Sequence, residues 1–177
     1  MTVADFELLP DDGNRYEIIG GLLSVSPSPT LDHQRIVLRI ASALERYLDE
    51  TNLGEAFISP VDVELSNFDV VEPDIAVVLN ENASVKQGKR IVGAPDIVVE
   101  VISPSSGKRD RVSKAALYAM NGVREYWLVD HEKRTFSVFA LERPNYIERT
   151  QPEGRVQSDV LDGFEIDLER LFRAPAG

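Results

Sequence analysis

The stretch Pro95-Asp96-Ile97-Val98-Val99-Glu100-Val101-Ile102 decides the fold of this chain. It is almost continuously apolar, which predicts a strand in the middle of a sheet, buried on both faces. Glu100 interrupts the apolar run, and an ionised carboxylate is costly to bury unless another group binds it. The stretch therefore predicts a central strand and also a partner for Glu100.

A second acid, Asp74, opens another apolar run, Ile75-Ala76-Val77-Val78-Leu79. If the two predicted strands are neighbours, Asp74 and Glu100 meet near the strand ends. Hard divalent cations such as Mg²⁺ bind oxygen ligands, often one or two carboxylates together with waters and phosphate. The backbone carbonyl of Val101 offers a further oxygen. The two strands therefore predict a site for a divalent cation.

Length and composition limit the class of protein. The chain has 177 residues, 43% of them hydrophobic, which suits a single domain over residues 1–177. It contains no cysteine, so disulfides, thiolate metal sites and a cysteine nucleophile are excluded. The N-terminal residues lack a signal-peptide pattern, and no apolar run is long enough to span a bilayer. We therefore expect a soluble, cytoplasmic protein that does not bind membranes.

The net charge of −11 argues against strong non-specific binding to nucleic acid. Such binding depends mainly on Lys and Arg side chains that neutralise phosphates. A local basic surface is still compatible with this charge, and Lys108-Arg109-Asp110-Arg111 is the densest basic cluster. The competing interpretation of that cluster is an ordinary solvated face.

Hydrophobic spacing and turn residues divide the rest of the chain into helices and strands. Apolar residues at spacings of three and four after Thr30 predict an amphipathic helix that ends before Gly54. Gly20-Gly21 between two apolar segments predicts a hairpin, and residues 80–93 are predicted to form a polar loop. We also expect strands at residues 56–58, 61–65, 125–130, 135–141 and 146–150, and helices at 2–9, 110–121 and 167–172. This order indicates a mixed sheet with helices against it, in the α/β class.

Several segments in order resemble a known family. They are Tyr16-Glu17-Ile18-Ile19-Gly20-Gly21, Ser26-Pro27-Ser28-Pro29 with His33-Gln34, Val71-Glu72-Pro73-Asp74, the stretch from Pro95 to Ser105, Lys108-Arg109-Asp110-Arg111 with Lys114 and Tyr118, and Gly122 to Asp130. With these segments the chain resembles the Uma2 family, a branch of the PD-(D/E)XK nuclease superfamily. The resemblance covers most of the chain and implies a restriction-endonuclease-like mixed β-sheet flanked by helices.

The superfamily pattern pairs Pro-Asp with Glu-x-Lys, and the chain departs from it at Ile102, where the lysine is expected. The resemblance implies that the lysine comes instead from the following helix. Lys114 is our first candidate, and Lys108 is the second. Glu17 matches an early acid of the family, which the resemblance implies lies at the same pocket.

As a nuclease, the chain would use Asp74 and Glu100 to ligate Mg²⁺ or Mn²⁺. Lys114 would orient the attacking water or help to deprotonate it, and would stabilise charge on the phosphate. Glu17 would hold a water or a second ion. The resemblance implies DNA as the substrate and a homodimer as the assembly.

The alternative is a catalytically silent fold that acts as a homo-oligomeric interaction protein. The net charge, Ile102, and the absence of acids at Gly20 and Leu22, where similar proteins commonly carry them, favour this alternative. His33 lies near the predicted buried face of its helix, so we expect a structural histidine near the pocket. With two histidines in the chain, a multi-histidine metal site is excluded.

Overall fold

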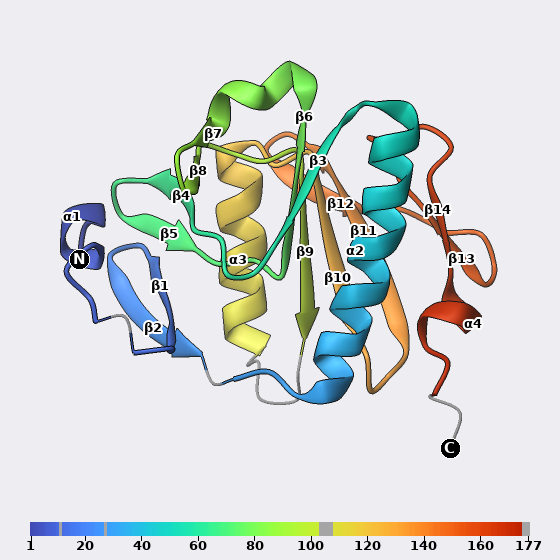
Figure 1. The fold of residues 1–177 in the computed structure, drawn as a ribbon, viewed down its shortest axis with the longest axis horizontal. Coiled ribbons are helices and arrows are strands. Elements are labelled where there is room, and N and C mark those ends of the chain that lie inside the picture. Colours follow the sequence, from blue (N-terminus) through green and yellow to red (C-terminus); the bar gives the residue numbers. More distant parts are fainter. Residues whose placement is uncertain (11, 27, 103–107, 175–177) are drawn as a thin grey trace.

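The computed structural model describes residues 1–10, 12–26, 28–102 and 108–174, and the side chains of residues 108–111 lie outside that description. Residues 103–105 of the resembling segments, and the side chains of the basic cluster at 108–111 with the second lysine candidate, Lys108, therefore lie outside the described part of the chain. The remaining chain forms two larger sheets and a two-stranded one, with helices packed against them (Figure 1).

A mixed sheet forms the centre of the molecule. Its strand order is β12-β11-β10-β9-β6-β3. The bounds are β3 (Gly54–Ile58), β6 (Ile75–Leu79), β9 (Ile97–Ile102), β10 (Glu125–Asp130), β11 (Thr135–Glu142) and β12 (Asn145–Glu148). β9 and β10 run parallel, whereas the other neighbouring strands of this sheet run antiparallel. β9 is central and β6 is its neighbour, so the predicted mixed sheet and the predicted pairing are both confirmed.

Two long helices cover opposite faces of this sheet (Figure 1). α2 (Leu31–Thr51) begins where the Thr30 side chain accepts a hydrogen bond from the His33 amide, and ends at Asn52, which adopts a left-handed backbone. Its buried face packs on Ile97, Val99 and Val101 of β9. α3 (Lys108–Asn121) packs on the other face, against Val98. Because side chains alternate along β9, this strand contributes to both cores. The prediction that both faces of the strand are buried is confirmed.

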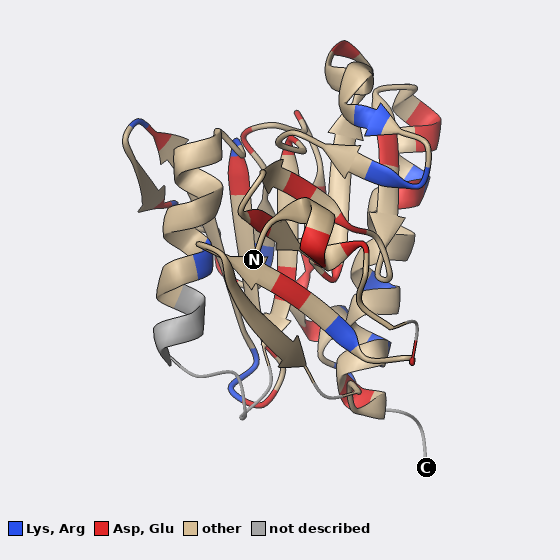
Figure 2. Cartoon of the chain, turned by 90° about the vertical axis from the view of Figure 1, so that its left-hand side faces the viewer, with Lys and Arg blue, Asp and Glu red and all other residues tan. Residues whose placement is uncertain are grey.

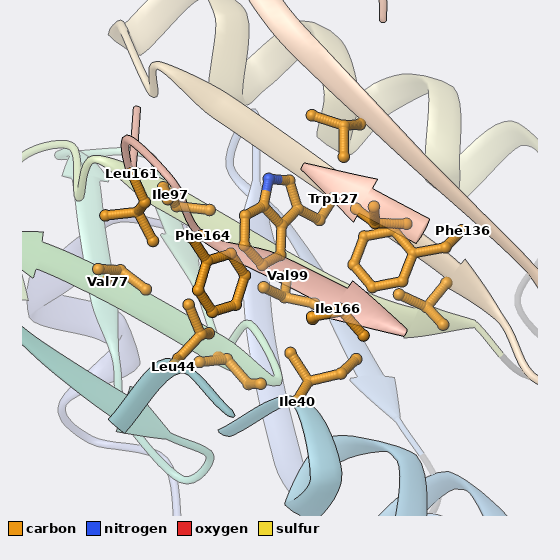
Figure 3. Close-up of a cluster of buried hydrophobic side chains, with 14 of the residues drawn as sticks. Ile40, Leu44, Val77, Ile97, Val99, Trp127, Phe136, Leu161, Phe164 and Ile166 are labelled. Atoms are coloured by element: carbon orange, nitrogen blue, oxygen red, sulfur yellow. The ribbon is translucent and has the colours of Figure 1, made fainter. Parts of the chain in front are cut away.

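The core beneath α2 is extended by the C-terminal segment (Figure 3). Three elements of this segment place side chains in the core: β13 (Arg155–Gln157), β14 (Glu165–Asp167) and the short helix α4 (Leu168–Leu171). Phe164 stacks on Trp127 with 5.7 Å between ring centroids. The Glu125 carboxylate, fully buried, accepts hydrogen bonds from Trp127, Ser158 and the amides of Asp159 and Val160, and so joins this segment to β10.

A second, more irregular sheet lies on the α3 side of the molecule. Its order is β2-β1-β5-β4-β8-β7. The bounds are β1 (Arg15–Ile19), β2 (Leu22–Ser26), β4 (Val63–Ser66), β5 (Asp69–Val71), β7 (Lys86–Gln87) and β8 (Arg90–Val92). The β1–β2 hairpin turns at Gly20-Gly21 as predicted, and both glycines have positive φ. Val63, Val71 and Ile91 of this sheet share a core with Tyr118 of α3.

The prediction of a polar loop at residues 80–93 was wrong. The segment contains the 3-10 helix η1 (Asn80–Val85) and the short strands β7 and β8, and Ile91 is buried. Strands of two or three residues are too short to show a hydrophobic period, so only the pairing of β8 with β4 and of β7 with β8 reveals them. The N-terminal helix α1 (Val3–Phe6) is likewise shorter than expected.

Candidate active site

The ends of β6 and β9 bring Asp74 and Glu100 together. Ile75 pairs with Val99 in the antiparallel register, so the preceding residue on β6 and the following residue on β9 lie side by side. The Val101 amide donates a hydrogen bond of 2.8 Å to Oδ2 of Asp74. The carboxylate of Asp74 is therefore held directly against the Glu100–Val101 segment, as the sequence predicted.

Asp74 is buried and bonded through both of its carboxylate oxygens. Oδ1 lies 3.2 Å from Nη1 of Arg15, and Oδ2 lies 3.1 Å from Nε2 of His33. Burial alone would raise the pKa of Asp74, but the bond and charge of His33, the Val101 amide and the Arg15 charge outweigh it. The pKa of Asp74 is consequently lowered, and this carboxylate is ionised at neutral pH.

Arg15 is anchored mainly by Glu72. Nε of Arg15 lies 2.7 Å from Oε1 of Glu72, and Nη2 donates to the Glu72 backbone carbonyl. The Ser59 hydroxyl donates to the same Oε1 across 2.6 Å. The guanidinium thus reaches Asp74 from a fixed position at the start of β1.

Lys114 joins two acids from different parts of the chain. Its Nζ lies 2.8 Å from Oε1 of Glu17, on β1, and 3.1 Å from Oε1 of Glu100, on β9. The Glu17 carboxylate also accepts from the Glu72 amide, and the Tyr118 hydroxyl donates to Glu100 across 2.8 Å. Lys114 and Tyr118 lie one turn apart on α3, so one face of this helix meets Glu100 twice.

The electrostatics of this group follow from its burial. The pKa of Glu100 is raised to about 7: burial is the largest cause, the charge of Lys114 opposes it, and the charges on Asp74 and Glu17 add to it. Burial would lower the pKa of Lys114, but the charges of Glu100 and Glu17 outweigh this and hold it above its usual value. Lys114 is therefore a permanent cation, whereas Glu100 is poised to exchange a proton near neutral pH.

The donor set fits a hard divalent cation. Within the described ranges, no group of three or more His, Asp or Glu side chains is placed so that it could hold a metal ion. Mg²⁺ does not need one, because it is commonly held by one or two carboxylates plus waters and phosphate oxygens. The four acids Glu17, Glu72, Asp74 and Glu100 face two permanent cations, Arg15 and Lys114. The charges on Asp74 and Glu17 add to burial in raising the pKa of Glu100.

Lys114 is bonded directly to Glu17 and Glu100. Asp74 is joined to this group through the amide of Val101, the residue that follows Glu100. His33 is buried beside Asp74, as expected, and its Nδ1 has no hydrogen-bond partner.

Sequence reasoning missed Arg15 and Glu72, and assigned no role to Tyr118. One signal was available for Arg15, since it lies two residues before Glu17 on the same strand face. The contact between Glu72 and Arg15 has no local signal, because it joins residues 57 positions apart.

Comparisons with known proteins identify the family and the fold of the chain. A family model described as Uma2, putative restriction endonuclease, matches residues 3–169. The structure is similar to the crystal structure of a putative nuclease belonging to DUF820 from Anabaena variabilis ATCC 29413, with a TM-score of 0.82. That likeness has 20% sequence identity and covers 97% of each chain, so it shows the shared fold. The search of curated proteins found no match.

Proposed function

Since this chain belongs to the Uma2 family, whose members are described as putative restriction endonucleases, we propose that it is a metal-dependent endonuclease that hydrolyses the phosphodiester bonds of DNA. One observation carries the proposal. Asp74, at the start of β6, lies against the Glu100–Val101 segment of β9, and Glu100 is bonded to Lys114 of α3. In this proposal Lys114 of α3 takes the role of the lysine that the superfamily pattern places at position 102.

In this proposal Asp74, Glu100 and the Val101 carbonyl hold Mg²⁺ or Mn²⁺. Such an ion would stabilise charge on the phosphate and lower the pKa of a bound water. The lowered pKa of Asp74 suits a permanent ligand, because its carboxylate is ionised at neutral pH. Glu100, with a pKa near 7, loses its proton readily when a cation is offered.

We propose that Lys114 acts as a charged donor. Because its pKa is raised, it keeps its proton, so it orients the attacking water and stabilises a phosphate oxygen without serving as a base. Glu17 holds Lys114 in place through the 2.8 Å contact, and so acts as a positioning residue. Tyr118 fixes the rotamer of Glu100 in the same way.

The test is DNA cleavage by purified protein with Mg²⁺ or Mn²⁺, followed by the conversion of supercoiled plasmid to nicked and linear forms. Asp74→Asn and Glu100→Gln keep the side-chain shapes but remove the charges, and we expect both to abolish cleavage. Asp32→Asn and Glu132→Gln, at exposed positions, are the matched controls and should cut at the wild-type rate. Full activity in both site variants would refute the assignment.

A second candidate function, a catalytically silent interaction protein, is favoured by one observation. Among the described strands, β2 forms an edge of the second, irregular sheet, and its Leu22, Leu23 and Val25 are exposed. An exposed apolar edge is suited to pairing with a second copy of the chain. Acidic residues also predominate in the middle of the face that carries this sheet, which is unfavourable for DNA (Figure 2).

Two measurements separate these candidates. A nuclease should bind Mn²⁺, seen as a rise in the unfolding temperature, and should cut plasmid. A silent protein should do neither. The homodimer and the cytoplasmic location expected from the sequence stay predictions. No helix in the described part of the chain is long and apolar enough to cross a membrane.

A further inference from the structure

The two oxygens of Asp74 differ in what they can still bind. Oδ2 accepts two N–H donors, from Val101 at 2.8 Å and from Nε2 of His33 at 3.1 Å. Each carboxylate oxygen offers about two acceptor sites, so Oδ2 is fully used. Oδ1 accepts from Arg15 Nη1 at 3.2 Å, a longer contact. A cation that binds Asp74 must therefore approach Oδ1, the oxygen that Arg15 already occupies.

Arg15 cannot simply leave when a cation arrives. Its Nε and Nη2 are bonded to Glu72, whose side chain is itself held by Ser59. The Arg15 side chain is 21% exposed, and its Nη1 and Nη2 each carry a second N–H beyond the contacts described. A divalent ion on Oδ1 would consequently lie close to a fixed positive charge, and the two would repel each other in a partly buried site.

An anion placed between these two cations removes the repulsion. A phosphodiester is suited to this place, because one oxygen can bind the metal while another accepts from the planar guanidinium, which is well matched to phosphate. Glu72 keeps the guanidinium oriented for this contact. Lys114 is a second cation, bonded to Glu100 rather than to Asp74. The site thus offers a negative ligand two fixed cations in addition to the metal.

We propose that Arg15 couples the binding of the divalent cation to the binding of a DNA phosphate. Arg15 weakens metal binding when the phosphate is absent and contributes a direct contact when the phosphate is present. The two ligands then bind cooperatively, and by thermodynamic linkage each raises the affinity of the other by the same factor. This inference rests on the proposed function and adds a substrate-binding residue to it.

The test is calorimetric titration of Mn²⁺ into the protein, with and without a short DNA duplex whose phosphorothioate linkages resist cleavage. For the wild type we expect the duplex to raise the Mn²⁺ affinity by about tenfold or more. Arg15→Gln should bind Mn²⁺ alone several-fold more tightly than the wild type, and the duplex should then raise its affinity by less than about threefold. Arg35→Gln removes a half-buried arginine that pairs with Asp32 outside the site, and should behave as the wild type.

A second variant guards against misfolding. Arg15→Gln leaves Glu72 buried without its cation, whereas the double variant Arg15→Gln, Glu72→Gln removes both partners and avoids an unpaired charge. Thermal unfolding checks that each variant is folded, and the double variant should show the same loss of coupling. Unchanged coupling in the folded variants, or weaker binding of Mn²⁺ alone by Arg15→Gln, overturns the role of Arg15. No Mn²⁺ binding by the wild type under either condition overturns the metal site itself, and with it both proposals.

Discussion

Nζ of Lys114 lies 3.1 Å from Oε1 of Glu100, although the two residues belong to a helix and a strand and stand 14 positions apart. The same nitrogen lies 2.8 Å from Glu17, which is 97 positions away. One buried cation therefore joins β1, β9 and α3. Its removal tests both the stability and the chemistry of the site.

Lys114→Met keeps the length of the side chain and removes its charge. Glu17 and Glu100 would then face each other in a buried site without a cation, so we expect a loss of about 3–5 kcal/mol in the free energy of unfolding. DNA cleavage should be lost as well. Urea denaturation and plasmid cleavage measure the two effects. Lys133→Met, at an exposed position, should change stability by less than about 1 kcal/mol; an equally stable Lys114→Met protein would show that the bridge contributes nothing.

Glu100→Gln should stabilise the metal-free protein at alkaline pH. The folded-state pKa of Glu100, about 7, lies above its ordinary value of 4.5, so folding disfavours the ionised form. This penalty is absent below pH 4.5, grows as the pH rises towards 7 and is complete above it. Glutamine mimics the protonated acid, so in EDTA the variant should gain about 2 kcal/mol at pH 8 and almost nothing at pH 4.5. A variant that is less stable than the wild type at pH 8 would contradict the shift.

Tyr118→Phe should raise the pKa of Glu100 further. Burial is the main reason that this pKa is raised, and the Tyr118 hydrogen bond is one of the interactions that oppose it. NMR of ¹³C-labelled glutamate in the metal-free protein should show a higher titration midpoint in the variant. The matched control is Tyr146→Phe, which removes a hydroxyl that donates to the Val123 carbonyl. Equal midpoints in Tyr118→Phe and wild type would exclude a role for the hydroxyl.

Glu125→Gln should destabilise the protein without touching the site. The carboxylate accepts from four donors, and a glutamine amide would turn an NH₂ group towards some of them. We expect a loss of about 3 kcal/mol in the free energy of unfolding, with cleavage intact below the unfolding temperature. Glu148→Gln, which removes an exposed acid bonded to Ser137, is the control for charge. A loss of cleavage in a folded Glu125→Gln protein would contradict this separation of roles.

Much of the fold could be predicted because its signals are local. The apolar run of β9, the spacing of apolar residues in α2 with its Thr30 cap, and the Gly20-Gly21 turn each depend on neighbouring residues. The short strands β5, β7 and β8 could not be predicted, because two or three residues form a strand only when another strand is present to pair with them.

The sequence by itself determined that two carboxylates stand within apolar strands and that a lysine follows on the next helix. Burial of an acid is costly, so its position in such a run already indicates a partner. Only the tertiary structure decided which partners these are. Arg15 and His33 reach Asp74, and Arg15 reaches Glu72, through contacts between residues far apart in the chain, and no periodic pattern encodes such contacts. Side-chain geometry at the end of the paired strands, rather than any motif, places a guanidinium on Oδ1 of Asp74.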